Sequence, residues 1–232
     1  MKRIFRVWSF LVLAIAAGFL VFTSPAMSST IIDFGIVVGT GSDLGSVSYN
    51  GVSGVLSGVG IEVDEVTYNS NPSTPLTNGL LNFDFTGGTY DSLSSTWSFA
   101  GGTIDVTGDL GTKTGLTLLT GSVYSATVVG FGNLEIVVGG FTDSKSALLL
   151  WELGYLTGNQ PSPTELVNGW TGTLNLSILT GGVDPNGSFS STKVLSGDVV
   201  NTPVPIPPSA LLLGSGVFGM IGFGFRRKSR KA

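Results

Sequence analysis

The sequence predicts an all-β fold, namely an antiparallel, β-sandwich-like single domain that covers residues 29–202. Three observations support this prediction. Apolar and polar residues alternate in many short runs, as they do in half-buried strands. Gly-Gly, Asn-Gly and Asn-Pro pairs stand between these runs and are typical of tight turns. Ser and Thr are abundant, and the short spacing of the runs is typical of antiparallel sandwiches and barrels.

Several segments show the strand alternation clearly. In the first of them, the alternation runs from Gly60 and slips near Glu65. The segments are 60–68, 81–85, 97–99, 104–106 and 174–178. Phrases similar to Leu-Thr-Gly-Gly recur at 85–88, 119–121 and 179–182. They keep a β-solenoid as the alternative fold, although no fixed repeat length accompanies them.

One segment, 146–156, departs from this pattern because it is apolar throughout except for Glu152. Its length is compatible with a buried strand or a short buried helix. Asp143 and Ser144 precede it and are typical helix caps, and Gly158 is a typical terminator. We therefore predict a short helix here, followed by a proline-containing loop at 160–163.

Composition excludes several classes of chemistry. The chain of 232 residues contains no Cys and no His. It therefore has no disulfide framework, no thiolate or imidazole metal site, and neither a Ser-His-Asp nor a Cys-His catalytic arrangement. All 15 acidic residues lie between Asp33 and Asp198, where only three lysines accompany them, so this span carries 3 − 15 = −12. Such a charge repels a polyanion, and we expect no nucleic-acid partner.

The N-terminal segment, residues 1–28, is predicted to be a signal peptide. Lys2, Arg3 and Arg6 form a positive region before the uncharged, mostly apolar run 7–22. Small residues follow, and signal peptidase is expected to cut after Ala26 or Ser28. The alternative is an uncleaved signal anchor, because the apolar run is long. In both cases the central domain is expected outside the cytoplasm.

The C-terminal segment, residues 203–232, has three parts. A proline box, Val204-Pro205-Ile206-Pro207-Pro208, is expected to be extended. The uncharged run 209–225 predicts a transmembrane helix, since seventeen residues of helix span about 25 Å. A basic cluster at 226–231 follows and is expected to stop transfer on the cytoplasmic side. Its members are Arg226, Arg227, Lys228, Arg230 and Lys231. The alternative, a buried core helix, fits poorly with five clustered bases beside it.

This order of proline box, glycine-bearing apolar run and basic cluster resembles the sorting tail of PEP-CTERM proteins. In that family the box is Pro-Glu-Pro, and Ile206 stands here in place of the Glu. The resemblance implies recognition and cleavage near the box by exosortase, a membrane-embedded cysteine protease. It also implies transient residence in the inner membrane. Delivery to the outer surface or extracellular matrix of a Gram-negative-type bacterium that makes exopolysaccharide would follow.

Motifs for catalysis are few. Ser190–Lys193 fits Ser-x-x-Lys and Lys113–Gly115 fits Lys-Thr-Gly, but their order is reversed relative to serine β-lactamases, and we expect both matches to be fortuitous. A glycosidase needs only two carboxyl groups. The candidate carboxyl groups are Glu62, Asp64, Glu65, Asp105, Asp109 and Glu135. We expect them to be solvating surface charges, and Glu62, Asp64 and Glu65 to form an exposed strand edge rather than a calcium site.

Aromatic side chains are the remaining candidates, because exposed rings stack on sugars. These candidates are Tyr90, Trp97, Trp151, Tyr155 and Trp170, and for each we expect a place in the core rather than a sugar platform. Trp97 alternates with Phe99 on one strand face, and Trp151 lies in the most apolar segment.

The sequence therefore predicts a non-enzymatic, exported surface or biofilm-matrix protein with no cofactor and no metal site. Its expected partners are signal peptidase, an exosortase-type protease, the inner membrane and exopolysaccharide. The alternatives are a carbohydrate-binding module, a secreted glycosidase, or a single-pass membrane protein that is never cut.

Overall fold

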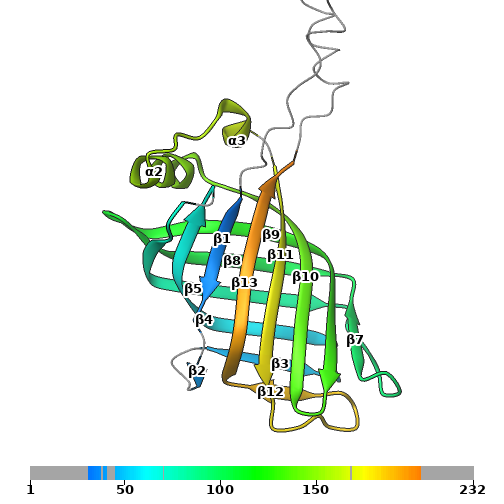
Figure 1. Cartoon of the computed structure of the whole chain (residues 1–232). Coiled ribbons are helices and arrows are strands. Elements are labelled where there is room, and N and C mark those ends of the chain that lie inside the picture. The colour runs from blue at the N-terminus through cyan, green and yellow to red at the C-terminus, as the bar shows by residue number, and fades with distance from the viewer. Residues whose placement is uncertain (1–30, 38, 41–44, 70, 168, 205–232) are drawn as a thin grey trace, which may run out of the picture.

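A computed structural model of the chain describes residues 31–37, 39–40, 45–69, 71–167 and 169–204, and antiparallel strands make up most of them. Figure 1 shows the elements with their labels. The strands are β1 (Ile32–Ile36), β2 (Gly39–Thr40), β3 (Ser46–Asn50), β4 (Val55–Tyr68), β5 (Thr74–Thr86), β6 (Thr89–Asp91), β7 (Thr96–Phe99), β8 (Gly101–Leu110), β9 (Lys113–Phe131), β10 (Leu134–Ser144), β11 (Trp170–Leu179), β12 (Phe189–Ser191) and β13 (Lys193–Pro203). Two helices, α2 (Ala147–Thr157) and α3 (Pro163–Val167), lie between β10 and β11.

Eight of the strands form a sheet that closes on itself. Their order is β1-β13-β11-β10-β9-β8-β5-β4, and β4 pairs back with β1. The shorter strands extend the edges of this closed sheet: β3 pairs with β4, β12 with β3, β7 with β9, β6 with β7, and β2 with β13. The prediction of an all-β antiparallel fold is confirmed, and the antiparallel pairing excludes a solenoid of stacked parallel strands for this part of the chain.

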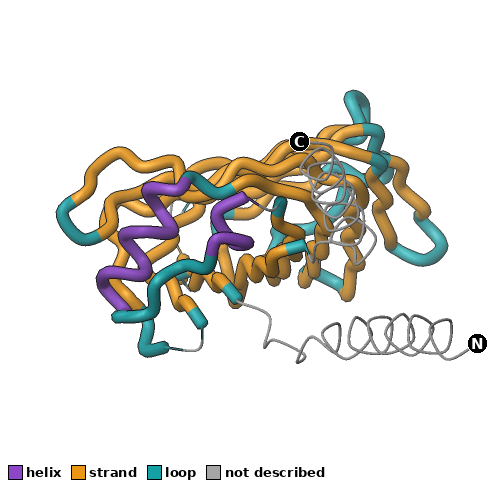
Figure 2. Tube along the Cα trace, turned by 90° about the horizontal axis from the view of Figure 1, so that it is seen from above, coloured by secondary structure: helices purple, strands orange, loops and turns teal. Residues whose placement is uncertain are grey.

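The closed sheet replaces the expected sandwich of two separate sheets, and long strands explain the difference. The first half of β9 pairs with β8, and its second half pairs with β10. One edge of β4 likewise pairs with β3 over its first half and with β1 over its second half. Each long strand thus passes from one layer to the other, and the two layers cross steeply in Figure 1. Figure 2 shows the flattened outline.

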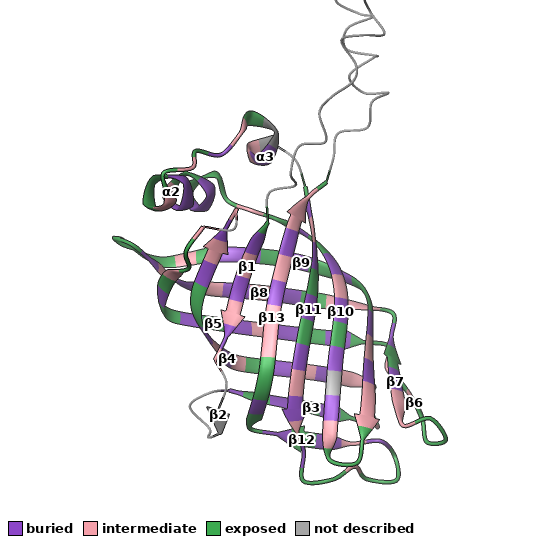
Figure 3. Cartoon of the chain, viewed as in Figure 1, coloured by how far each residue is buried: buried purple, intermediate pink, exposed green. Residues whose placement is uncertain are grey.

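The core fills the space between the two layers. Inward-facing residues alternate with exposed ones along the strands, as the purple and green bands of Figure 3 show. In β5, for example, Leu81, Phe83 and Phe85 are buried, whereas Asp84 between them is exposed. The register of β4 against β5 shifts between Val63 and Glu65, where the sequence alternation slips. A β-bulge there keeps Val66 directed inward.

The segment 146–156 forms a helix, as predicted, but with a different start. Ser146 is the N-cap, and its side chain accepts a hydrogen bond from the Leu149 N–H at 3.1 Å. Asp143 and Ser144, the expected caps, still belong to β10. Gly158 ends the helix with φ 72°, which is the left-handed conformation that glycine adopts at low cost.

Candidate functional site

The described chain begins and ends at one end of the barrel. β1 starts and β13 ends there, and α2 and α3 lie across the same end (Figures 1 and 2). The Val204 N–H donates a hydrogen bond of 2.8 Å to the Gly169 carbonyl, which follows α3 in the chain. The exit of the chain towards the proline box is therefore fixed next to the helices. We call this end, with α2 and α3, the tether end.

Helix α2 has one face in the core and an apolar face towards solvent. Leu149, Leu150 and Leu153 are fully buried. On the opposite side, Leu148 and Trp151 are each 49% exposed, and Tyr155 is 76% exposed. Positions 148, 151 and 155 lie on one side of a helix because their spacing is three and four residues. The expectation that Trp151 and Tyr155 belong to the core is wrong.

The other three aromatic candidates are core or near-core residues. Trp97 is fully buried and donates a hydrogen bond from Nε1 to the Gly187 carbonyl at 2.9 Å. Tyr90 is partly buried and stacks on Trp97 with ring centroids 4.6 Å apart. Trp170 is 1% exposed. None of these three offers an open ring for a sugar.

Helix α3 is positioned by a capping box and by β4. The Ser162 N–H donates to Glu165 Oε2, and the Glu165 N–H donates to Ser162 Oγ. Pro163 occupies the first helical position, where the missing N–H costs nothing. The Tyr68 hydroxyl of β4 donates to Glu165 Oε1 at 3.4 Å, and burial together with Glu165 raises the pKa of Tyr68. A loop was expected at 160–163, and its last residue instead begins this short helix.

A buried ion pair lies at the tether end, where β10 leads into α2. Lys145 Nζ pairs with Asp143 Oδ2, and both side chains are fully buried. Asn201 Nδ2 donates to Asp143 Oδ1 at 3.3 Å, and Lys145 Nζ lies 5.6 Å from the ring centroid of Phe34. Burial lowers the pKa of Lys145 to about 8 and raises that of Asp143, while their mutual attraction opposes both shifts.

This cluster links four neighbouring strands and is more simply explained as structural. Asp143 belongs to β10, Trp170 to β11, Asn201 to β13 and Phe34 to β1. Trp170 Nε1 and Asn201 Oδ1 have no hydrogen-bond partner among the described residues, and buried groups of this kind often bind an ordered water. Sequence reasoning missed the pair, although two charged residues just before a helix whose one charged residue is Glu152 were a usable signal.

The candidate carboxylates are not gathered around a cleft. Glu62 and Asp64 lie on β4, Asp105 and Asp109 on β8, and all four are at least partly exposed. Glu65 is exposed. Burial raises the pKa of Asp33, and the charges of Asp198 and Glu65 raise it further. In the part of the chain that the structure describes, no three carboxylates are grouped so that they could hold a metal ion.

Glu135 was expected to be a solvated surface charge, and this expectation is wrong because its side chain is fully buried. The Thr180 hydroxyl donates to its Oε2 at 3.0 Å, and its Oε1 has no partner among the described residues. Burial raises the pKa of this carboxyl, and the Thr180 hydrogen bond opposes the shift. Its flanks, Leu134 and Ile136, are as apolar as Val137 and Val138, so the sequence did not reveal which residues point inward.

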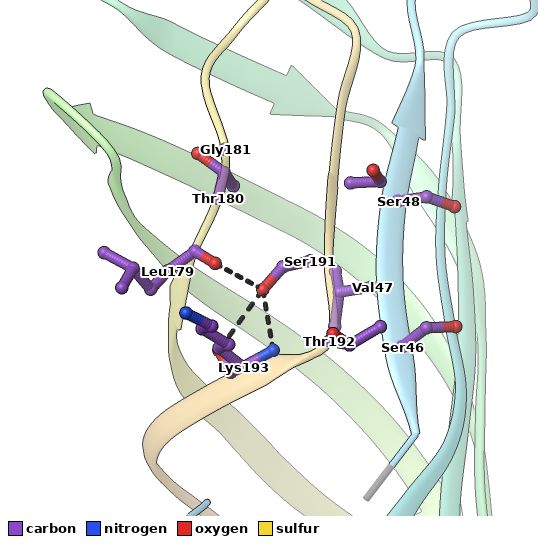
Figure 4. Close-up of a pocket in the computed structure, with 10 residues that line it drawn as sticks. Ser46, Val47, Ser48, Leu179, Thr180, Gly181, Ser191, Thr192 and Lys193 are labelled. Atoms are coloured by element: carbon purple, nitrogen blue, oxygen red, sulfur yellow. Dashed lines mark hydrogen bonds between the residues drawn. The ribbon is translucent and has the colours of Figure 1, made fainter. Parts of the chain in front are cut away.

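A pocket of about 350 Å³ lies between β3, β12 and the ends of β11 and β13 (Figure 4). Its polar lining consists of hydroxyl groups and Lys193, without a carboxylate or an aromatic ring. Ser191 Oγ donates to the Leu179 carbonyl at 2.7 Å and accepts from the Lys193 N–H at 3.0 Å. The Ser-x-x-Lys fragment lies on β12 and at the start of β13, not on a helix, so it lacks the β-lactamase arrangement.

Most residues of the predicted sorting signals lie outside the described residues. These are Ala26 and Ser28, the proline box from Pro205 to Pro208, the run 209–225 and the basic cluster. Val204 is described, and it is 40% exposed at the tether end. Among the described residues, neither helix is long and apolar enough to cross a bilayer.

Comparison with protein-family models, curated proteins and solved structures finds no match to this chain.

Proposed function

We propose that this protein is an exported, non-enzymatic surface or biofilm-matrix protein that an exosortase-type protease sorts through residues 203–232. The sequence order of proline box, apolar run and basic cluster carries this proposal. The structure supports it in one respect. The last strand, β13, ends at Pro203, directly before the box. A cut within the box would leave every described strand intact.

The acidic, hydroxyl-rich barrel suits a protein of a hydrated matrix. Most of its described carboxylates are at least partly exposed, and such surface charges keep a domain soluble at high local concentration. The described pocket lacks the carboxyl pair that glycoside hydrolysis requires. The proposed role is therefore structural or adhesive, with export by a signal peptide and transient residence in the inner membrane.

Carbohydrate binding is the second candidate, because Trp151 and Tyr155 are exposed. The hydroxyl-lined pocket carries no ring that could stack on a sugar, whereas α2 carries these two exposed rings on one face. The exposed rings Tyr124 and Phe131 lie on β9, not on this helix. This candidate predicts saturable affinity for the host exopolysaccharide that is lost in Trp151→Ala. Unchanged affinity in that variant would exclude α2 as a sugar platform.

The test of the proposed function is intact mass and terminal peptide mapping of the protein from its native host, after separation of cells, membranes and medium. We expect a mature chain that starts near Met27 or Ser29 and ends between Val204 and Pro208. Pro205→Ala with Pro207→Ala should retain the basic cluster and stay in the membrane, whereas Pro185→Ala in an exposed loop should be processed normally. If the unaltered protein keeps residues 226–231, the sorting proposal is wrong.

A further inference from the structure

The exposed side of α2 is an apolar surface without a partner in the described structure. Leu148, Trp151 and Tyr155 form it, and the helix is held in place from behind by three fully buried leucines. A helix that is apolar on both sides normally contacts a second apolar phase, such as a membrane or another protein. Tryptophan and tyrosine side chains are also enriched at membrane–water interfaces, where their rings contact lipid and their polar groups contact water.

The position of α2 in the molecule favours a membrane over another protein as the partner of its exposed side. It lies at the tether end, where Val204 leaves the barrel beside Gly169. Only four residues, 205–208, separate Val204 from the apolar run 209–225. Four residues can span no more than about 14 Å, whatever their conformation. A chain held in a bilayer by residues 209–225 therefore keeps its tether end close to the headgroups.

The neighbouring charges are compatible with an uncharged lipid surface. No Lys or Arg lies on the exposed side of α2, and Glu152 lies towards the β8–β9 turn, where a Cβ on Gly111 would approach its Oε1 to 2.7 Å. Lys113, just after that turn, is exposed. Binding through this surface would thus depend on apolar burial more than on attraction to anionic lipids.

We propose that the Leu148–Trp151–Tyr155 face of α2 lies on the lipid surface while the chain is anchored, and so orients the barrel with its tether end on the membrane. This contact rests on the proposed function, because it needs the anchor at 209–225. It adds a second membrane contact, which would present the proline box at a fixed height and orientation to a membrane-embedded protease.

The test places a single environment-sensitive fluorophore on the chain that lacks the predicted signal peptide, residues 29–232, in phosphatidylcholine vesicles. Because the chain has no Cys, Y155C offers one labelling site, and L148C repeats the measurement on the same face. L93C is the matched control, since Leu93 is 98% exposed in the β6–β7 turn. Iodide serves as the quencher in water, and a nitroxide-labelled lipid as the quencher in the bilayer. Flotation of the vesicles reports whether the chain is anchored.

We expect the labels on Y155C and L148C to be quenched by the nitroxide lipid and protected several-fold from iodide, as side chains about 5–10 Å into the headgroup boundary would be. The label on L93C should remain open to iodide. If the chain floats but Y155C and L148C behave like L93C, the lipid contact is wrong and the anchor stands. If the chain does not float, the anchor and the contact both fail.

A second copy of the chain is the competing occupant. In that case the label on Y155C would be shielded from both quenchers, and the shielding would increase with the ratio of protein to lipid. That result would overturn the lipid contact and assign the face to self-association.

Discussion

At the scale of single residues, the buried Asp143–Lys145 pair is the most consequential charge arrangement. Removing one partner of a buried pair leaves the other charge uncompensated and typically costs about 3–5 kcal/mol. We therefore expect Asp143→Asn to lower the free energy of unfolding by that amount in urea denaturation. Asp184→Asn, at an exposed turn, is the control and should change it by less than about 0.5 kcal/mol. Equal effects of both variants would contradict a structural role for the pair.

The same pair predicts a pH dependence of stability. Burial lowers the pKa of Lys145 from 10.5 to about 8. Between these pH values the unfolded chain binds more protons at this site than the folded chain does, so the free energy of unfolding rises with pH. We expect the difference in this free energy between the wild type and Lys145→Met to rise by a few kcal/mol over that interval.

The control for this titration is Lys193→Met, at an exposed lysine. Because this side chain is on the surface, its removal should change the free energy of unfolding by less than about 0.5 kcal/mol. A difference between the wild type and Lys145→Met that stays constant from pH 8 to 10.5 would show that Lys145 titrates normally.

At the scale of elements, the sequence prediction and the structure differ over which residue caps the N-terminus of α2. The sequence favoured Asp143 and Ser144 as caps, whereas Ser146 Oγ accepts the Leu149 N–H. Because a lost N-cap costs about 1 kcal/mol, Ser146→Ala should lower the free energy of unfolding by that amount. Ser144→Ala should be nearly neutral. If Ser144→Ala is the more damaging variant in urea denaturation, the helix begins where the sequence suggested.

Close packing between β11 and β13 gives a second prediction at this scale. A Cβ on Gly172 would lie 2.3 Å from both Asn201 Nδ2 and Phe141 Cζ, whereas a Cβ on Gly181 would meet no atom within 4 Å. Overpacking typically costs about 1–3 kcal/mol, so Gly172→Ala should reduce the free energy of unfolding by at least that much. Gly181→Ala, measured in the same way, should be neutral or slightly stabilising.

The strands show how far local pattern predicts structure. The alternation at 81–85 and 174–178 correctly identified which side chains face the core, because one face of each strand is buried and the other is exposed. The pattern failed at Glu135, since apolar residues flank it on both sides. It also failed at Trp151, because apolar residues occur on every side of α2 and do not reveal which side packs against the protein.

At the scale of the whole molecule, the closed sheet was not predictable from the sequence. Closure depends on β4, whose second half pairs with β1 after its first half has paired with β3. The alternation of apolar and polar residues along a strand is the same whether the strand keeps one neighbour or changes neighbours halfway. The same topology brings the first strand, β1, beside the last, β13, so both chain exits lie at the tether end.

In this topology, β1 is the strand that closes the sheet. The topology therefore predicts how many residues can be removed from each end of the chain without loss of the fold. A chain of residues 29–204, the expected mature product, retains β1, β13 and the Val204–Gly169 hydrogen bond. It should therefore unfold in a single transition at the same urea concentration as the chain that keeps residues 205–232.

A chain of residues 38–204 lacks β1. It would expose the backbone groups of β4 and β13 that pair with β1, and would remove Ile32 and Phe34 from the core. Because burying two such side chains contributes roughly 3–6 kcal/mol, this shorter chain should fail to fold cooperatively when followed by tryptophan fluorescence and circular dichroism. If it unfolds like the 29–204 chain, the β1–β4 pairing does not hold the barrel closed.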